Sequence, residues 1–177
     1  MSRIHLFALG FLLLGIGISG SSEAAPTTGT IKVAFILSQF EDQEYQSGHD
    51  QDYFEDLAFG ETDSMWDYFD EVSRSQLNIE GDVYGPYTLD GNAEDYGDEN
   101  LNFVRDSVEI ADDDIYYPDY HAVMVIHSGP GQESSGNDDD IWSIHWPSAN
   151  IETDDDYTIG RITQAPEYQN SNGERSP

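Results

Sequence analysis

Two nearly continuous apolar runs constrain the fold of this chain more than any other feature of its sequence. The first is IKVAFILSQF at residues 31–40, and the second is HAVMVIH at residues 121–127. Such runs, rich in β-branched and aromatic residues, are typical of strands covered on both faces. A sheet covered on both faces needs helices packed against it, so we expect a layered protein of the α/β (α+β) class with a mixed sheet.

Three segments have the spacing of helices. Residues 52–59 predict a short helix that ends at Gly60. A second helix is expected after the N-capping candidates of residues 62–64, with its apolar side chains in the core. These side chains are Met65, Tyr68, Phe69 and Val72. Between residues 99 and 111, apolar side chains recur every three or four positions, which is the strongest helical pattern in the chain.

Shorter patterns predict the remaining strands. Residues 77–84 alternate, and Gly85-Pro86 separates them from residues 87–89, so we expect two strands around a turn. Residues 157–163 predict a final strand at the edge of the sheet. No periodicity follows, and we expect residues 166–177 to form a disordered tail.

The N-terminus has the anatomy of a secretory signal peptide. Arg3 precedes an apolar run of residues 6–18 and a small, polar stretch that ends at Ala25. A membrane anchor is the alternative, but the run is shorter than the about 20 residues that a spanning helix needs. We therefore expect cleavage after residue 25. The mature protein would be secreted and extracellular, without attachment to the membrane. It would form one domain over residues 26–177.

The charge of the chain is extreme. Its 36 Asp and Glu residues outnumber 6 Lys and Arg, and the formal net charge is −30. Loss of residues 1–25 removes one charge of each sign, so that value stays the same. Nucleic acid and anionic membranes are excluded as partners by repulsion. This excess of acidic over basic residues favours a halophilic protein, because salt at about 1 M screens charges beyond roughly 3 Å and so weakens their mutual repulsion. A calcium-loaded surface is the alternative.

Acidic runs offer candidate metal ligands. Three Asp-Asp-Asp runs begin at Asp112, Asp138 and Asp154, and the chain has no cysteine. Clustered carboxylates suit calcium, although none of the runs has the spacing of an EF-hand loop, and solvated acidic loops are the plainer reading. The candidate calcium ligands are Glu133, Asp138, Asp139 and Asp140. No two histidines have the spacing of zinc ligands on one helix.

Four segments, taken in order, carry a family resemblance. They are YFEDLAFGE (53–61), SMWDYFDEVSRSQLNIEGDVYGPYTL (64–89), VMVIHSGPGQESSGNDDDIWSIHW (123–146) and YTIGRITQAPEYQ (157–169). This sequence resembles the immune inhibitor A family of secreted zinc metallopeptidases. The resemblance implies a zincin-like upper subdomain, in which a twisted mixed sheet with packed helices lies above the active-site cleft.

The same resemblance implies a zinc site that these residues do not supply. The family binds zinc through a His-Glu-x-x-His helix, which would follow a segment like residues 172–175, and this motif does not occur here. No catalytic residue or zinc ligand is therefore assigned, and we expect a truncated peptidase fragment that is inactive by itself. Its intact form would act on peptide or protein substrates, and Tyr157 and Ile159 are the candidate residues for binding substrate by strand addition. The alternative is a non-catalytic secreted module that binds a partner or holds calcium.

Overall fold

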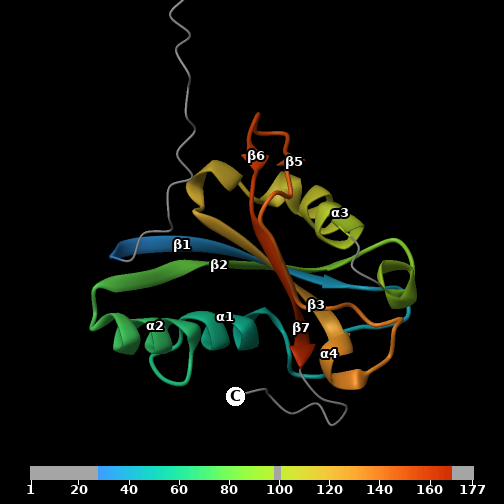
Figure 1. Cartoon of the computed structure of the whole chain (residues 1–177), viewed down its shortest axis with the longest axis horizontal. Helices are drawn as coiled ribbons and strands as arrows, with labels where there is room; N and C mark the ends of the chain where they lie inside the picture. Colours follow the sequence, from blue (N-terminus) through green and yellow to red (C-terminus); the bar gives the residue numbers. More distant parts are fainter. Residues whose placement is uncertain (1–27, 98–100, 169–177) are drawn as a thin grey trace, which may run out of the picture.

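A five-stranded mixed sheet forms the centre of the protein, and helices cover both of its faces (Figure 1). The computed structural model describes residues 28–97 and 101–168. The strand order is β2-β1-β3-β7-β4, in which the first four strands are parallel and β4 is antiparallel to β7. The expected α/β class with a mixed sheet is confirmed. The predicted signal peptide lies outside the described residues.

Helices separate the strands along the chain up to β4, and β5, β6 and β7 then follow without a helix between them. The strands of the main sheet are β1 (Gly29–Gln39), β2 (Leu77–Thr88), β3 (Ala122–Pro130), β4 (Ile144–Trp146) and β7 (Ile162–Tyr168). The helices are α1 (Gln51–Phe59), α2 (Met65–Ser73), α3 (Leu101–Ala111) and α4 (Gln132–Ser135), with 3-10 turns η1 (Ala93–Tyr96), η2 (Asp112–Asp114) and η3 (Tyr117–Asp119). A separate two-stranded ribbon pairs β5 (Ile151–Glu152) with β6 (Thr158–Ile159).

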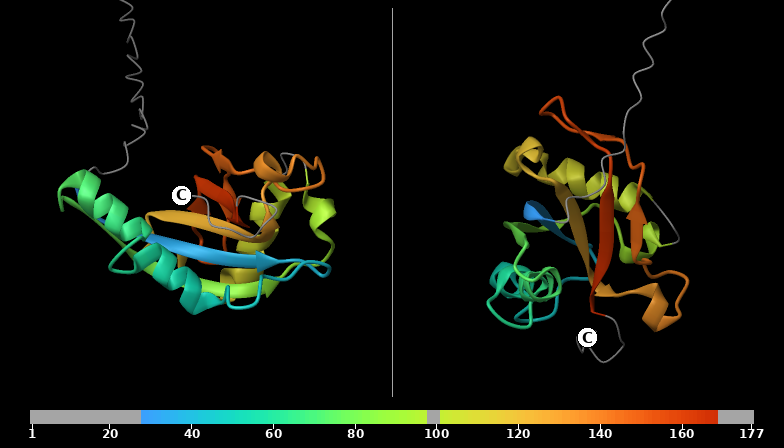
Figure 2. Two further views of the ribbon diagram at one scale, coloured as in Figure 1. Left: turned by 90° about the horizontal axis from the view of Figure 1, so that it is seen from below. Right: turned by 60° about the vertical axis from the view of Figure 1, so that its left-hand side comes forward.

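The strand β1 divides the core into two layers. Its odd residues, such as Phe35 and Leu37, pack with Phe54 of α1, and its even residues, such as Ile36, pack with Phe103 of α3. Successive side chains of a strand point to opposite faces, so a continuous apolar run fills both layers. Figure 2 shows α1 and α2 on one side of the sheet and α3 on the other. Both buried-strand predictions are confirmed.

Local capping explains where the first two helices begin and end. The side chain of Asp50 accepts a hydrogen bond from Tyr53 N, the side chain of Ser64 accepts one from Asp67 N, and Gly60 ends α1. The helix predictions are confirmed, with residues 99 and 100 outside the described part. The expected core role of two α2 side chains is wrong, because Tyr68 is 61% exposed and Val72 is 56% exposed.

Three strand predictions need correction. Residues 77–88 form one strand instead of two, because the chain continues through the cis Gly85–Pro86 bond while its register against β1 shifts between Ile36 and Ser38. Residues 157–163 are not one edge strand: they contain β6 and the start of β7, which lies between β3 and β4. Residues 166–168 belong to β7 and are not part of a tail; residues 169–177 lie outside the described part.

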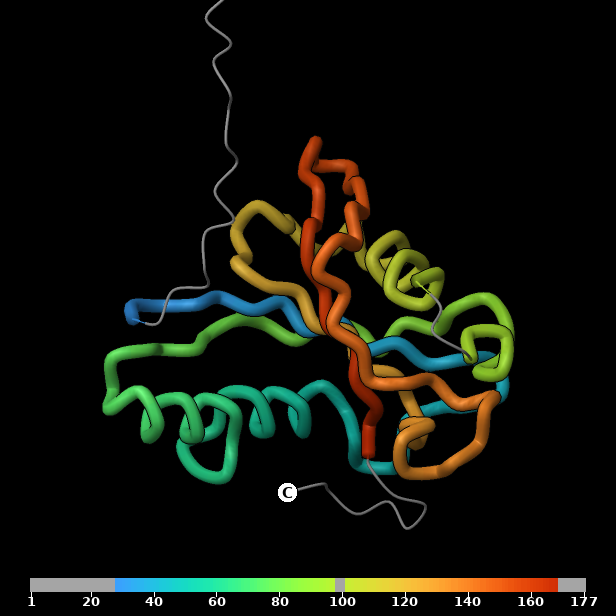
Figure 3. Tube along the Cα trace, viewed as in Figure 1, coloured from blue at the N-terminus to red at the C-terminus, as the bar shows by residue number. Residues whose placement is uncertain are grey.

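The β5–β6 ribbon stands beyond the end of the sheet at which β7 begins, as the tube in Figure 3 shows. The strand β4 is an edge strand of the main sheet and pairs with the first residues of β7 at this end. No helix in residues 28–97 and 101–168 has both the length and the apolar character that a bilayer crossing requires.

Candidate functional site

The buried carboxylate of Glu167 joins three segments at the carboxyl ends of the parallel strands. Its Oε1 accepts a hydrogen bond from Gln46 N at 2.8 Å and lies 2.5 Å from Nδ1 of His49. Its Oε2 accepts a hydrogen bond from Gly129 N at 2.9 Å. The side chain of Glu167 is 0% exposed, so these partners replace the water that a carboxylate otherwise requires.

The loop between β1 and α1 closes over these strand ends. Ser128 Oγ donates to the carbonyl of Gln43 at 2.7 Å, and Tyr45 donates its hydroxyl proton to the carbonyl of Ile126 at 2.5 Å. Gly129 has a φ of +87°, which favours glycine, and a Cβ there would displace the Gln43 side chain, whose Nε2 would lie 1.5 Å away. Burial, and then the charge of Glu167, raises the pKa of Tyr45.

A carboxylate and an imidazole 2.5 Å apart are able to exchange a proton, which is the chemistry of a general acid–base pair. Here, however, His49 also stacks on Tyr53 with ring centroids 4.2 Å apart, and the loop covers Glu167. The pair therefore ties the loop to β7, with the His49 side chain 18% exposed and the Glu167 side chain buried. We interpret it as a structural clamp.

His127 is a second buried polar group beside this clamp. Its Nδ1 lies 2.9 Å from the carbonyl of Ser128, which assigns the proton to Nδ1, while Nε2 has no hydrogen-bond partner in the described part of the chain. Burial lowers the pKa of His127 from 6.5 to about 4, so the ring is neutral at pH 7. Ser128 donates its hydroxyl proton to Gln43 and not to this histidine, so the two side chains do not form a nucleophile and its base.

The four candidate calcium ligands bond to different protein groups. The carboxylate of Glu133 accepts hydrogen bonds from the backbone and hydroxyl of Ser143, and that of Asp138 accepts one from Gln132. Asp139 and Asp140 bond to Asn137 through a backbone N–H and a carboxylate, respectively. Across residues 28–97 and 101–168, no three His, Asp or Glu side chains form a group that could hold a metal ion. The residues do not fit a preformed calcium site, and calcium binding stays a prediction.

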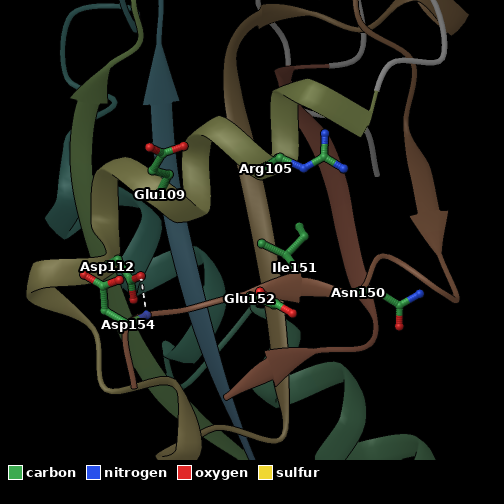
Figure 4. A pocket seen from close by; sticks show the side chains of 7 residues that line it. All are labelled: Arg105, Glu109, Asp112, Asn150, Ile151, Glu152 and Asp154. Carbon is green, nitrogen blue, oxygen red and sulfur yellow. Dashed lines mark hydrogen bonds between the residues drawn. The ribbon is translucent and has the colours of Figure 1, made fainter. Parts of the chain in front are cut away.

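Two of the acidic runs meet in space, although 42 positions separate them in the chain. The backbone N–H of Asp154 donates to the carboxylate of Asp112 at 2.8 Å. Figure 4 shows this bond in a pocket of about 410 Å³, which Arg105 and Glu109 of α3 also line. Burial raises the pKa of Asp112, the hydrogen bond from the Asp154 N–H opposes this, and the charges of Asp154, Asp155 and Asp113 add to the increase. Periodicity in the sequence does not predict this contact, because the two runs do not lie in the same helix or strand.

The two candidate substrate-binding residues do not lie on an edge of the main sheet. Ile159 belongs to β6 and is 3% exposed, and Tyr157 precedes that strand and is 37% exposed. The edge strands of the main sheet are β2 and β4, and in β4 the residues Ile144, His145 and Trp146 pair with Gln164, Thr163 and Ile162 of β7. The sequence prediction missed β4 because three residues are too few to show a period of two.

No known protein family matches this sequence, and no curated protein matches it either.

Proposed function

We propose that this chain carries part of the catalytic domain of an extracellular zinc metallopeptidase, and that β4 is the strand against which an extended peptide substrate lies. One observation carries the proposal: β4 is an antiparallel edge strand beside four parallel strands. Within the described residues its outer side pairs with no other strand, so its backbone N–H and C=O groups are available for strand addition. The sheet, in that respect, suits the zincin-like upper subdomain that the resemblance implies.

An apolar groove on the α1 side of the sheet supports the same proposal. The groove measures about 200 Å³, and its lining includes Phe54 of α1, Met124 and Ile126 of β3, and Pro166 of β7. The His-Glu-x-x-His helix does not occur in this sequence. A helix that joins a domain needs an apolar surface on which to bury its apolar stripe, and the groove offers one.

The residues of this chain would bind and orient the peptide. Zinc, when bound, would supply an activated water for hydrolysis, but no residue here has the spacing of its ligands. We therefore expect the chain alone to show no chelator-sensitive peptidase activity.

The test uses the natural protein, purified from its source with an antibody raised against residues 28–168. We expect a polypeptide that binds one zinc ion and hydrolyses casein, and that loses this activity with a chelator. A natural polypeptide that binds no zinc and hydrolyses nothing would contradict the proposal. It would favour the non-catalytic secreted module instead.

The role of β4 is tested with two proline variants of that protein, Ile144→Pro and His145→Pro. Adjacent residues of a strand present their N–H groups to opposite sides, so one variant breaks the ladder with β7 and the other removes an N–H from the outer edge. We expect the outer-edge variant to keep its near-UV circular dichroism and lose at least about tenfold in kcat/KM, the loss of a hydrogen bond worth about 1.4 kcal/mol. Unchanged turnover in both variants would exclude strand addition at β4.

A further inference from the structure

The strand β4 is an uncharged edge of the sheet in a strongly acidic chain. Residues 141–151, which include β4, contain no Asp, Glu, Lys or Arg, although the chain carries 36 acidic residues. The opposite edge strand, β2, carries Glu80 and Asp82. Charged side chains are one of the means by which proteins keep an edge strand from pairing with another chain. Because β4 has none, this edge suits the addition of a strand.

The two faces of β4 differ in polarity. Ile144 and Trp146 point to the same face, because alternate residues of a strand do, and both are half-buried. Trp146 packs against the apolar core layer to which α3 contributes. His145 points to the other face, where it is exposed and its Nδ1 lies 3.0 Å from Oγ1 of Thr163. The edge therefore has an apolar side and a polar side.

Gln164 of β7 fixes the orientation of Trp146. The indole Nε1 of Trp146 donates to Oε1 of Gln164 at 2.9 Å, and Nε2 of Gln164 donates to the carbonyl of Trp142 at 2.8 Å. Gln164 is 1% exposed, so both ends of its amide are bonded inside the protein. The N–H of the indole is thereby satisfied, and apolar ring surface remains for a neighbouring strand. A contact surface that is already ordered loses less entropy when a ligand binds.

A strand added to β4 would place its side chains against this apolar side. Neighbouring strands lie about 4.8 Å apart, and side chains opposite each other on one face come within about 5.5 Å. The strand β7 already covers the inner side of Ile144 and Trp146, because both pair with its residues. A strand on the outer side would cover what remains exposed. Apolar side chains would gain free energy there by leaving water, and salt of about 1 M, which screens charges, would leave this gain in place.

We propose that β4 selects extended peptides that carry apolar side chains at alternate positions, which pack against Ile144 and Trp146. This inference rests on the proposed function, since it names the class of substrate for strand addition at β4. It holds for either direction of the peptide, because side chains alternate in parallel and antiparallel strands alike.

The test compares two peptides of the same composition in NMR titrations of the ¹⁵N-labelled protein, at a potassium chloride concentration that preserves its near-UV circular dichroism. In acetyl-Thr-Leu-Thr-Leu-Thr-amide both leucines lie on one face of an extended chain, whereas in acetyl-Thr-Thr-Leu-Leu-Thr-amide they lie on opposite faces. We expect the alternating peptide to bind at least about fivefold more tightly, because roughly half of one further leucine side chain leaves water. It should shift the indole signal of Trp146 and not that of Trp66, which bonds to Asn78.

The outcomes separate this inference from the proposed function. Equal affinities of the two peptides, with shifts at the amides of residues 144–146, would overturn the selectivity and leave strand addition at β4 in place. If neither peptide shifts these amides, strand addition itself fails, and the inference fails with it. Neither result depends on zinc or on peptidase activity, which are measured on the natural protein.

Variants locate the selectivity on the apolar side of β4. Ile144→Thr keeps a β-branched side chain in the strand and removes one apolar contact, so the preference for the alternating peptide should fall to about twofold or less. The control Tyr68→Ala removes an exposed aromatic side chain from α2 and should keep the preference at about fivefold or more. An unchanged preference in Ile144→Thr, or an equal fall in both variants, would show that the apolar side of β4 does not select the peptide.

Discussion

Protonation of His127 should make the stability of this protein depend on pH in the mildly acidic range. The imidazole is 1% exposed, its ring packs edge-on to Phe103 with centroids 5.7 Å apart, and its Nε2 finds no partner within the described residues. A charged ring in this position would lose its hydration without gaining a compensating bond. The perturbation to test is therefore acidification, compared between the native chain and His127→Leu.

The magnitude follows from the two pKa values of the ring. Burial lowers the pKa of His127 from 6.5 to about 4 in the folded state. Between these pH values the unfolded chain binds a proton that the folded chain does not, so the stability that the neutral ring contributes is present above pH 6.5 and is lost as the pH falls toward 4. A difference of about 2.5 pH units at 1.36 kcal/mol each amounts to a loss of about 3 kcal/mol.

The assay is urea unfolding at fixed potassium chloride concentration and at several pH values between 7 and 4. Carboxylates also titrate in this range, so the informative quantity is the native free energy of unfolding minus that of His127→Leu at each pH. We expect this difference to fall by about 3 kcal/mol from pH 7 to pH 4. The control His145→Leu replaces an exposed histidine. Its free energy of unfolding should fall between pH 7 and pH 4 by as much as that of the native protein. If the curves of the native protein and His127→Leu run parallel, the reasoning is refuted.

Three further outcomes can be measured by the same unfolding experiments. Glu167→Ala leaves the buried N–H of Gly129, the partly buried N–H of Gln46 and the ring of His49 without their acceptor, and should cost about 3 kcal/mol. The exposed control Glu152→Ala should cost less than about 0.5 kcal/mol, and similar losses in the two variants would contradict the clamp. Gly81→Ala places a Cβ 1.8 Å from the carbonyl oxygen of Val33 and should cost about 3 kcal/mol. An unfolding midpoint equal to that of the native protein would show that β1 and β2 move apart at a lower cost than expected. The charge of −30 predicts a higher unfolding midpoint in about 3 M than in about 0.2 M potassium chloride with chelator present, and equal midpoints would reject the halophilic interpretation.

Local patterns predicted the elements whose signals are long and regular. The runs at residues 31–40 and 121–127 are buried strands, and α3 follows the apolar spacing found before Ala111. The same patterns misjudged Tyr68 and Val72, because amphipathic spacing identifies a stripe and not whether a neighbouring element covers all of it. They also missed most of β7, which continues through Pro166 and whose pairing with β3 shifts register after His127.

The candidate site depended still more on long-range contacts. Glu167 lies in a segment without periodicity, and its partners Gln46, His49 and Gly129 lie more than 30 positions away. Nothing in the residues around Glu167 distinguishes it from the other 35 acidic residues of the chain. Only the parallel order of β1, β3 and β7 brings these groups to one end of the sheet.

By itself, the sequence determined the α/β class, the two buried strands, the positions of the main helices and the strongly acidic surface. Each of these depends on the period of nearby side chains or on a sum over residues, and both are properties of the chain read in order. The tertiary structure alone decided that β4 is an edge strand, that Asp112 meets Asp154 and that Arg161 lies among tyrosines. Those facts depend on which strands pair, and strand pairing is set by packing between segments far apart in the chain.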